Sequence, residues 1–93
     1  MDTHNETRMA SGELCARISG QKTVVGAKQI RRALTSGIAK QVYLAENADP
    51  AITEPIAVLC RQQKVTLAWV RSMADLGRAC GIEVGAAAAA VVN

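Results

Sequence analysis

The sequence predicts an α/β protein, a three-layer α/β/α sandwich built around a small four-stranded mixed sheet. Short apolar runs rich in β-branched residues alternate along the chain with longer segments in which apolar residues recur at helical spacing. Glycine, or proline with polar neighbours, stands at most of the junctions between them. This alternation is typical of a sheet that is covered by helices on both faces.

Size and composition limit the chain to one domain. Its 93 residues suffice for a single core, and 49% of them are apolar. Since Phe is absent and only Tyr43 and Trp69 are aromatic, the core has to be built from Ala, Val, Leu and Ile. We expect residues 1–10 to form a flexible N-terminal tail and residues 11–93 to form the domain.

Two helices and two strands are expected in the first half of the chain. A helix over residues 11–20 is followed by the short β-branched strand Thr23–Val25. Gly26 supplies a sharp turn into a second helix, Ala27–Ser36, which ends at a glycine just past its last residue. The apolar run Lys40–Ala45 then indicates a strand buried on both faces. The residues expected to point inward from the two helices are Leu14, Cys15, Ile18, Ile30, Ala33 and Leu34.

The second half continues the alternation. Turn residues Glu46–Pro50 precede a helix that we expect to begin at Thr53, its N-cap, with a proline in the first turn. Thr66–Val70 is the third strand. A last helix is expected over residues 72–81, with its first residue, a serine, as the N-cap and an acidic residue three positions later.

The alanine-rich segment Ala86–Val92 poses a choice, because alanine is the best helix former. Gly85 precedes the segment, two valines end it, and a fourth strand is what the alternation still lacks. Small side chains also suit a central strand on which helices pack closely from both sides. We therefore expect a strand here.

Basic residues are segregated along the chain. The net charge is only +3, but six basic residues and no acid lie between residues 17 and 40, whereas all eight acids lie outside that stretch. Such a cluster indicates a polyanionic partner, which by charge alone is a nucleic acid, an acidic membrane surface or an acidic protein. The six residues are Arg17, Lys22, Lys28, Arg31, Arg32 and Lys40.

Catalytic and metal-binding chemistry have little support. Cys15, Cys60 and Cys80 are widely spaced and form no CxxC pair, so we expect reduced, mostly buried thiols that fill the core. The single histidine, His4, is poorly placed to activate a cysteine nucleophile. No Ser-His-Asp set or paired carboxylates can be assembled. We therefore expect no enzymatic activity, no metal and no cofactor.

The cytoplasm is the expected location. Residues 1–12 are polar and include Asp2 and Glu6, which is unlike a signal peptide. No apolar run approaches the roughly 20 residues that a membrane span requires. We expect a monomer that has no membrane partner.

The helix that follows Gly26 carries the clearest candidate site. Lys28, Gln29 and Arg32 lie at i, i+1 and i+4 and therefore share one exposed face, near N–H groups that attract phosphate. Arg and Lys can donate to guanine O6 and N7, and Gln can donate and accept. On this segment alone, a nucleic-acid site and a solvated basic face are equally supported. Gly26-Ala27-Lys28 is not a phosphate-binding P-loop, since the preceding glycine and the following Ser or Thr are missing.

Gly81–Gly85 is the second candidate. Ile82 and Val84 are branched apolar residues in a loop where polar residues are usual. Either they tuck into the core, which is the more common outcome, or they form an exposed apolar platform for a base or a partner. Taken alone, the sequence favours burial.

Three stretches point to a known family. Val25–Gln29, Ala48–Pro50 and Leu76–Ala87, with their spacing, resemble the ribosomal protein L-seven-Ae family, closest to its bacterial YbxF-like branch. The run Leu-Gly-Arg-Ala-Cys-Gly-Ile is the most specific part, and the glycine-led helix start is the second. The resemblance covers residues 11–92.

The resemblance implies an α/β/α protein that binds kink-turn RNA, a bent helix–bulge–helix built on tandem sheared G·A pairs. Such a kinked stem opens base edges that regular A-form RNA hides. By similarity, Gly26 and Ala27 bring the backbone near the RNA, while Lys28, Gln29 and Arg32 face the guanines. Residues Ile82, Glu83 and Val84 cover the extruded bulge nucleotide, which reverses the expectation of burial for this loop.

The chain departs from one family pattern. Archaeal and eukaryotic members carry Asn-Glu and a downstream Lys where this chain has Lys28-Gln29 and Arg32. A Glu acceptor is thus replaced by a neutral amide, so the hydrogen-bond pattern cannot be copied over. The alternative function is a protein-interaction module that keeps the fold and uses the Ile82–Val84 loop against a protein partner. The resemblance implies structured RNA, ribosomal RNA included, as the partner.

Overall fold

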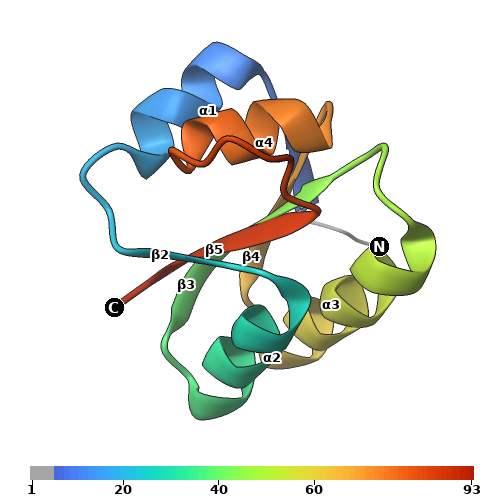
Figure 1. The fold of residues 1–93 in the computed structure, drawn as a ribbon. Helices are drawn as coiled ribbons and strands as arrows, with labels where there is room; N and C mark the ends of the chain where they lie inside the picture. The colour runs from blue at the N-terminus through green and yellow to red at the C-terminus, as the bar shows by residue number, and fades with distance from the viewer. Residues whose placement is uncertain (1–5) are drawn as a thin grey trace.

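The computed structural model describes residues 6–93 and has a sheet covered on each face by two helices (Figure 1). Helices α1 and α4 lie on one face, and α2 and α3 lie on the other. This arrangement confirms the α/β/α sandwich. The elements are β1 (Glu6–Met9), α1 (Ser11–Ile18), β2 (Thr23–Val25), α2 (Ala27–Ser36), β3 (Ala39–Ala45), α3 (Pro50–Gln63), β4 (Thr66–Val70), α4 (Met73–Ala79) and β5 (Ala88–Val92).

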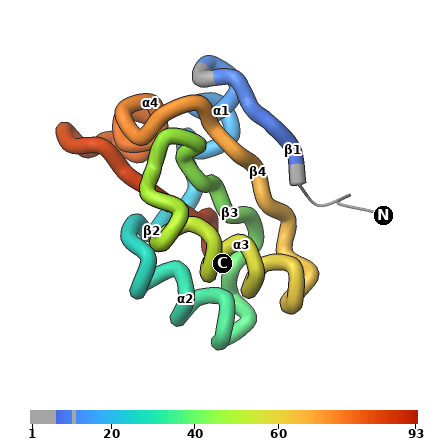
Figure 2. Tube along the Cα trace, turned by 90° about the vertical axis from the view of Figure 1, so that its right-hand side faces the viewer, coloured from blue at the N-terminus to red at the C-terminus, as the bar shows by residue number. Residues whose placement is uncertain are grey.

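The sheet is mixed and follows the order β1-β4-β3-β5-β2. β1 pairs with β4, and β4 with β3, in parallel, whereas β5 is antiparallel to both β3 and β2. The ends of β1, β2, β3 and β4 therefore meet at the same end of the sheet as the start of β5. We call this the carboxyl end of the sheet, and Figure 2 views the molecule from that side.

The sheet has five strands rather than the expected four. Residues 6–9, expected in a flexible tail, form β1 and pair with β4 from Glu6↔Leu67 to Met9↔Val70. The segment is polar and lies at the edge of the sheet, and of Thr7, Arg8 and Met9 only the last is buried. An edge strand of this kind lacks the apolar pattern by which strands are recognised. Ala10 is the N-cap residue of α1, and the rest of the expected tail, residues 1–5 with His4, lies outside the described residues.

Helix α3 begins earlier than expected, and Thr53 is not its cap. The Asp49 side chain accepts a hydrogen bond of 2.9 Å from the Ala51 N–H, and Pro50 occupies the first turn. Asp49 and Pro50 thus start the helix, whereas the sequence predicts a turn at these residues. Thr53 is buried inside the helix, and Pro55 lies within it. Pro55 lacks one backbone donor, yet packing on the sheet carries the helix on to Gln63.

Other boundaries agree with the sequence. Helix α2 has the predicted limits, and Gly37 closes it in the left-handed region with φ 79°. Ser72 caps α4 by accepting a 3.1 Å hydrogen bond from the Asp75 N–H. Within the alanine-rich segment expected to be a strand, Ala88–Val92 form β5, which is buried along its whole length. The pairing of β5 with both β3 and β2 thus overrides the helical preference of alanine.

The core has one layer on each side of the sheet. Tyr43 and Leu76 are buried between the sheet and α1 and α4, while Ile30 and Ile56 are buried on the α2 and α3 side. Of the six residues expected to point inward from the first two helices, only Cys15 is exposed. Among the other thiols, Cys60 is buried and Cys80 is half-buried.

The N-cap of α3 can be tested directly. We expect Asp49→Ala to lower the free energy of unfolding by about 1 kcal/mol, because the Ala51 N–H loses its acceptor. Asp49→Asn should keep most of the stability, since its amide oxygen can accept the same bond. Urea unfolding of the three proteins measures the difference. Equal stability of Asp49→Ala and the parent would show that Asp49 is not the cap.

Stability should fall at alkaline pH through Tyr43. Burial raises the pKa of Tyr43, and nearby Arg17 lowers it less. A tyrosine in the unfolded chain ionises near pH 10, so the unfolded state loses its proton first and is favoured as the pH rises above about 10. We expect Tyr43→Phe to flatten the fall in stability between about pH 9.5 and 11 in urea titrations. An unchanged slope would exclude Tyr43 as its source.

Candidate functional site

The turn between β2 and α2 is open and requires glycine. Gly26 has φ 106° and ψ 141°, which side chains rarely allow, while the space around its Cα is empty. Its N–H donates to the Ala88 carbonyl at 3.3 Å, and its own carbonyl accepts from the Ile30 N–H at 3.0 Å. No side chain caps α2. Its first N–H groups therefore point out of an exposed, uncapped helix start, where an anion can bind.

The outer face of α2 is cationic and unpaired. Lys28, Gln29, Arg31 and Arg32 are exposed, whereas Ile30 on the opposite side is buried. Within residues 6–93, no carboxylate forms a salt bridge with these three cations, and the first turn of α2 has no acid. A shallow hollow of about 400 Å³ runs along this face, lined by Lys28, Arg31, Arg32, Thr35 and Ser36.

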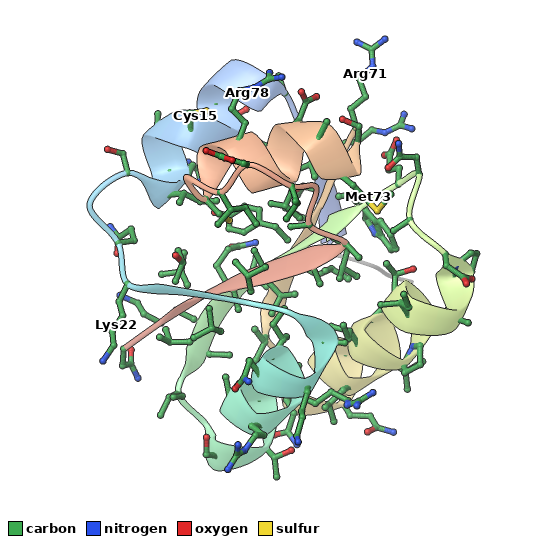
Figure 3. All side chains as sticks on the ribbon, in the orientation of Figure 1. Cys15, Lys22, Arg71, Met73 and Arg78 are labelled. Carbon is green, nitrogen blue, oxygen red and sulfur yellow. The ribbon has the colours of Figure 1, made fainter. Side chains whose placement is uncertain are left out.

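The basic cluster of the sequence does not form one patch. Arg17 lies 3.4 Å from Glu13 in a surface ion pair. The Lys22 carbonyl accepts from the Val92 N–H, which places Lys22 at the end of the sheet opposite Gly26. Figure 3 shows Lys22 and Arg71 at opposite ends of the molecule. Lys40 also belongs to the Lys22 end, because its neighbours pair with the last residues of β5.

The loop between α4 and β5 is exposed, so the burial favoured by the sequence alone is wrong. Val84 is 70% exposed and Ile82 is 36% exposed. Gly81 turns the chain away from α4 with φ 78°, and the Ile82 N–H donates to the Gly77 carbonyl at 3.0 Å. The loop thus presents two branched apolar side chains to solvent, which is costly unless a partner covers them.

The loop and the start of α2 lie at the same end of the sheet. The chain runs from Val84 into β5, and the carbonyl of Ala88, the first residue of β5, binds the Gly26 N–H. Figure 2 shows both segments along the β2–β5 edge, with α4 and its loop above and α2 below. The structure therefore brings together the two segments that hold Gly26, Ala27, Lys28, Gln29, Arg32, Ile82, Glu83 and Val84.

A second hollow at this end involves residues that the sequence did not single out. It measures about 510 Å³ and is lined by Arg8, Met9, Ala10, Glu46 and Arg71. Arg8 binds both carboxylate oxygens of Glu46, and this hydrogen bonding lowers the pKa of the carboxyl. Arg71 is exposed and has no ion-pair partner among the described residues. These residues meet only through the sheet order, which sequence spacing does not reveal.

Nothing in the described part of the chain forms a metal centre. Residues 6–93 contain no group of three His, Cys, Asp or Glu side chains that could hold an ion. Burial raises the pKa of Cys80, which keeps its thiol protonated and unreactive near neutral pH. No described helix is both long and apolar enough to cross a membrane.

Comparison with known proteins agrees with this geometry. The model of the Ribosomal protein L7Ae/L30e/S12e/Gadd45 family matches residues 11–93. The chain is 48% identical over 72 residues to an RNA-binding protein of Geobacillus sp. (strain WCH70), an alignment that covers 77% of this chain and 88% of that protein. It is 45% identical, with the same coverage, to the RNA-binding protein YbxF of Geobacillus stearothermophilus.

A solved structure supports the fold. The Giardia lamblia 15.5kD RNA binding protein superposes with a TM-score of 0.74 at 24% identity, covering 89% of this chain and 68% of that one. The family match extends from helix α1 through β5 and includes both segments of the candidate site. The chain therefore belongs to the Ribosomal protein L7Ae/L30e/S12e/Gadd45 family, in which its relatives are of the YbxF type.

Proposed function

We propose that this protein binds RNA and recognises kink-turns, stabilising their bent form. The observation that supports this most is the pairing of two surfaces at one end of the sheet. One is the open, cationic start of α2, and the other is the exposed apolar loop Ile82–Val84. A cationic surface alone would suit any polyanion, whereas an apolar wall beside it suits an unstacked base.

The α2 surface suits the G·A pairs of the kinked stem. Lys28 and Arg32 lie one helical turn apart, so they can donate to successive bases in a groove that the kink has opened. Guanine O6 and N7 are the natural acceptors for both. Gln29 lies beside them and can donate and accept, which suits an edge with mixed donors and acceptors. Gly26 and Ala27 allow the RNA backbone to approach the helix end.

The loop suits the extruded nucleotide of the bulge. A base that has left the stack exposes a flat, poorly hydrated face, and Ile82 and Val84 offer apolar surface for it. The same contact removes both side chains from water. Glu83, exposed between them, can accept from an amino or hydroxyl group of the nucleotide.

Phosphate contacts are best assigned to Arg31 and Arg71. Arg31 lies on the cationic face of α2, and Arg71 follows β4 at the carboxyl end of the sheet. Arg17 and Lys22, which the charge cluster also suggested, lie toward the other end. Each phosphate contact should add to the salt dependence of binding without selecting a sequence.

We further propose a cytoplasmic, monomeric and non-enzymatic role, with structured RNA, ribosomal RNA included, as the partner. The alternative, a protein-interaction module, would use the same apolar loop. The two are separated by titrating a kink-turn duplex and a straight duplex of equal length at moderate salt. Preference for the kinked RNA supports the proposal, and equal affinity favours the alternative.

Arg32→Ala tests the base contacts. We expect it to weaken kink-turn binding by about 1–3 kcal/mol, roughly 5- to 150-fold in Kd, because one base-edge donor is lost. Arg61→Ala is the matched control, since Arg61 lies in the last turn of α3 at the far end of the sheet and should leave Kd unchanged. Gel-shift titration measures both. Equal losses of affinity in the two variants would show that binding depends on overall positive charge and not on a specific contact from Arg32.

Lys28→Glu should separate stability from binding. A cation in the first turn of α2 opposes the helix dipole, so the acidic substitution should raise the free energy of unfolding by about 0.3–1 kcal/mol. Binding of kink-turn RNA should nevertheless fall, because a cation that faces guanine acceptors becomes an anion. Lys28→Gln, which only removes the charge, should lie between the two in both measurements. A variant that is destabilised, or that binds RNA as well as the parent, would contradict this role.

A further inference from the structure

We propose that Gly77, assisted by Asn47, is a positioning residue that holds the Ile82–Val84 loop in its exposed form and thereby sets the preference for kinked RNA. The inference rests on the proposed function and adds a control of specificity that lies behind the binding surface. Neither residue belongs to the set that faces the RNA. Gly77 acts through its close contact with the loop backbone, and Asn47 acts through its side-chain oxygen, which accepts from a backbone N–H of helix α4.

Gly77 allows the loop to lie directly on helix α4. A Cβ at Gly77 would stand 2.1 Å from the Val84 carbonyl oxygen and 3.1 Å from the Gly85 Cα. Both are backbone atoms, so a side chain cannot rotate away to relieve the clash. Gly77 has no positive φ, in contrast to Gly81. Space for the loop, rather than backbone freedom, is therefore what requires glycine at this position.

The other end of the loop is fixed against the start of α4. The Ala86 N–H donates to the Met73 carbonyl at 3.0 Å. A Cβ at Gly85 would stand 3.1 Å from the Met73 Cβ and 3.3 Å from its carbonyl carbon. Met73 and Gly77 lie one helical turn apart, so the segment Val84–Ala86 follows one face of the helix backbone.

Asn47 connects helix α4, with the loop that lies on it, to the sheet. Its side-chain oxygen accepts a 2.8 Å hydrogen bond from the Met73 N–H, and Asn47 lies just after β3. The end of β3 is joined to the same segment, because the Ala45 N–H donates to the Ala87 carbonyl at 2.9 Å. Ala88 then binds Gly26. The loop and the start of α2 are thus connected through short, backbone-based links.

These links explain how two exposed apolar side chains keep a defined place. A loop that is already fixed loses little conformational entropy when a base packs on it. If the loop is pushed away from α4, Ile82 and Val84 no longer meet the bulge nucleotide that the α2 contacts bring to the site. Affinity for the kinked RNA should fall, while phosphate-dominated affinity for straight RNA remains.

A double-mutant cycle tests this coupling. In the parent, we expect Val84→Ala to lower affinity for kink-turn RNA by about tenfold; in a Gly77→Ala background, the same change should cost less than about twofold. Arg32→Ala should cost the same in both backgrounds, because the α2 contact does not depend on the loop. Gly12→Ala is the control, since a Cβ there meets nothing within 4 Å.

Three further variants keep the inference testable if Gly77→Ala does not fold. Gly85→Ala requires a shift of only a few tenths of an ångström and should give a weaker form of the same effect. Asn47→Ala should lower the preference for kinked over straight RNA, whereas Asn47→Asp should restore it, because a carboxylate also accepts the Met73 N–H and suits a helix start. Circular dichroism and thermal unfolding establish that each variant is folded at the temperature of the titration.

The outcomes are distinct. Additive effects of Gly77→Ala and Val84→Ala in folded proteins would overturn the inference, as would an unchanged preference in Gly77→Ala, Gly85→Ala and Asn47→Ala. If the parent itself does not prefer kinked RNA, the proposed function fails instead. In that case an altered loop is still detectable from the NMR signals of the Ile82 and Ala86 amides in Gly77→Ala.

Discussion

The candidate site depends on the insertion of β5 between β3 and β2. β5 is buried along its whole length, and its alanines leave room for helices on both faces. Its first residue binds Gly26, and the residue before it accepts a hydrogen bond from Ala45. The loop that enters β5 carries Ile82 and Val84. Placing this one strand therefore fixes both walls of the site, and larger side chains in it would separate the helices from the sheet.

Local chemistry was enough to predict much of the fold. A glycine at each end set the limits of α2, and the serine cap set the start of α4. Failures occurred where the decisive contact is distant in sequence. β1 is polar and is a strand only because it pairs with β4. Asp49-Pro50 suits a turn and a helix start equally well by itself, and burial of the following residues decides between them.

Part of the candidate site could also be predicted from local sequence. Helical spacing placed Lys28 and Arg32 on one face, because both lie within a single element. The exposure of Val84 was not predictable from composition, since apolar residues in a loop are usually buried. In the structure the backbone of Val84 and Gly85 lies directly on Gly77 of α4, while the Val84 side chain faces solvent. The sequence did not predict Arg71 as a site residue, because only the arrangement of the strands places it at the carboxyl end of the sheet.

The sheet order has a consequence for synthesis of the chain. Among the described strands, β2 pairs with β5 alone. Thr23 therefore has no strand partner until Val91 has been made, and the Gly26 N–H has no acceptor until Ala88 has been made. During translation the amino-terminal elements emerge first, yet β2 and the glycine turn cannot be held in place until β5 has been made. In a nascent chain that lacks β5, the start of α2, and therefore its cations, would not be held in place against the sheet. RNA recognition should therefore switch on late and abruptly, once the last strand enters the sheet.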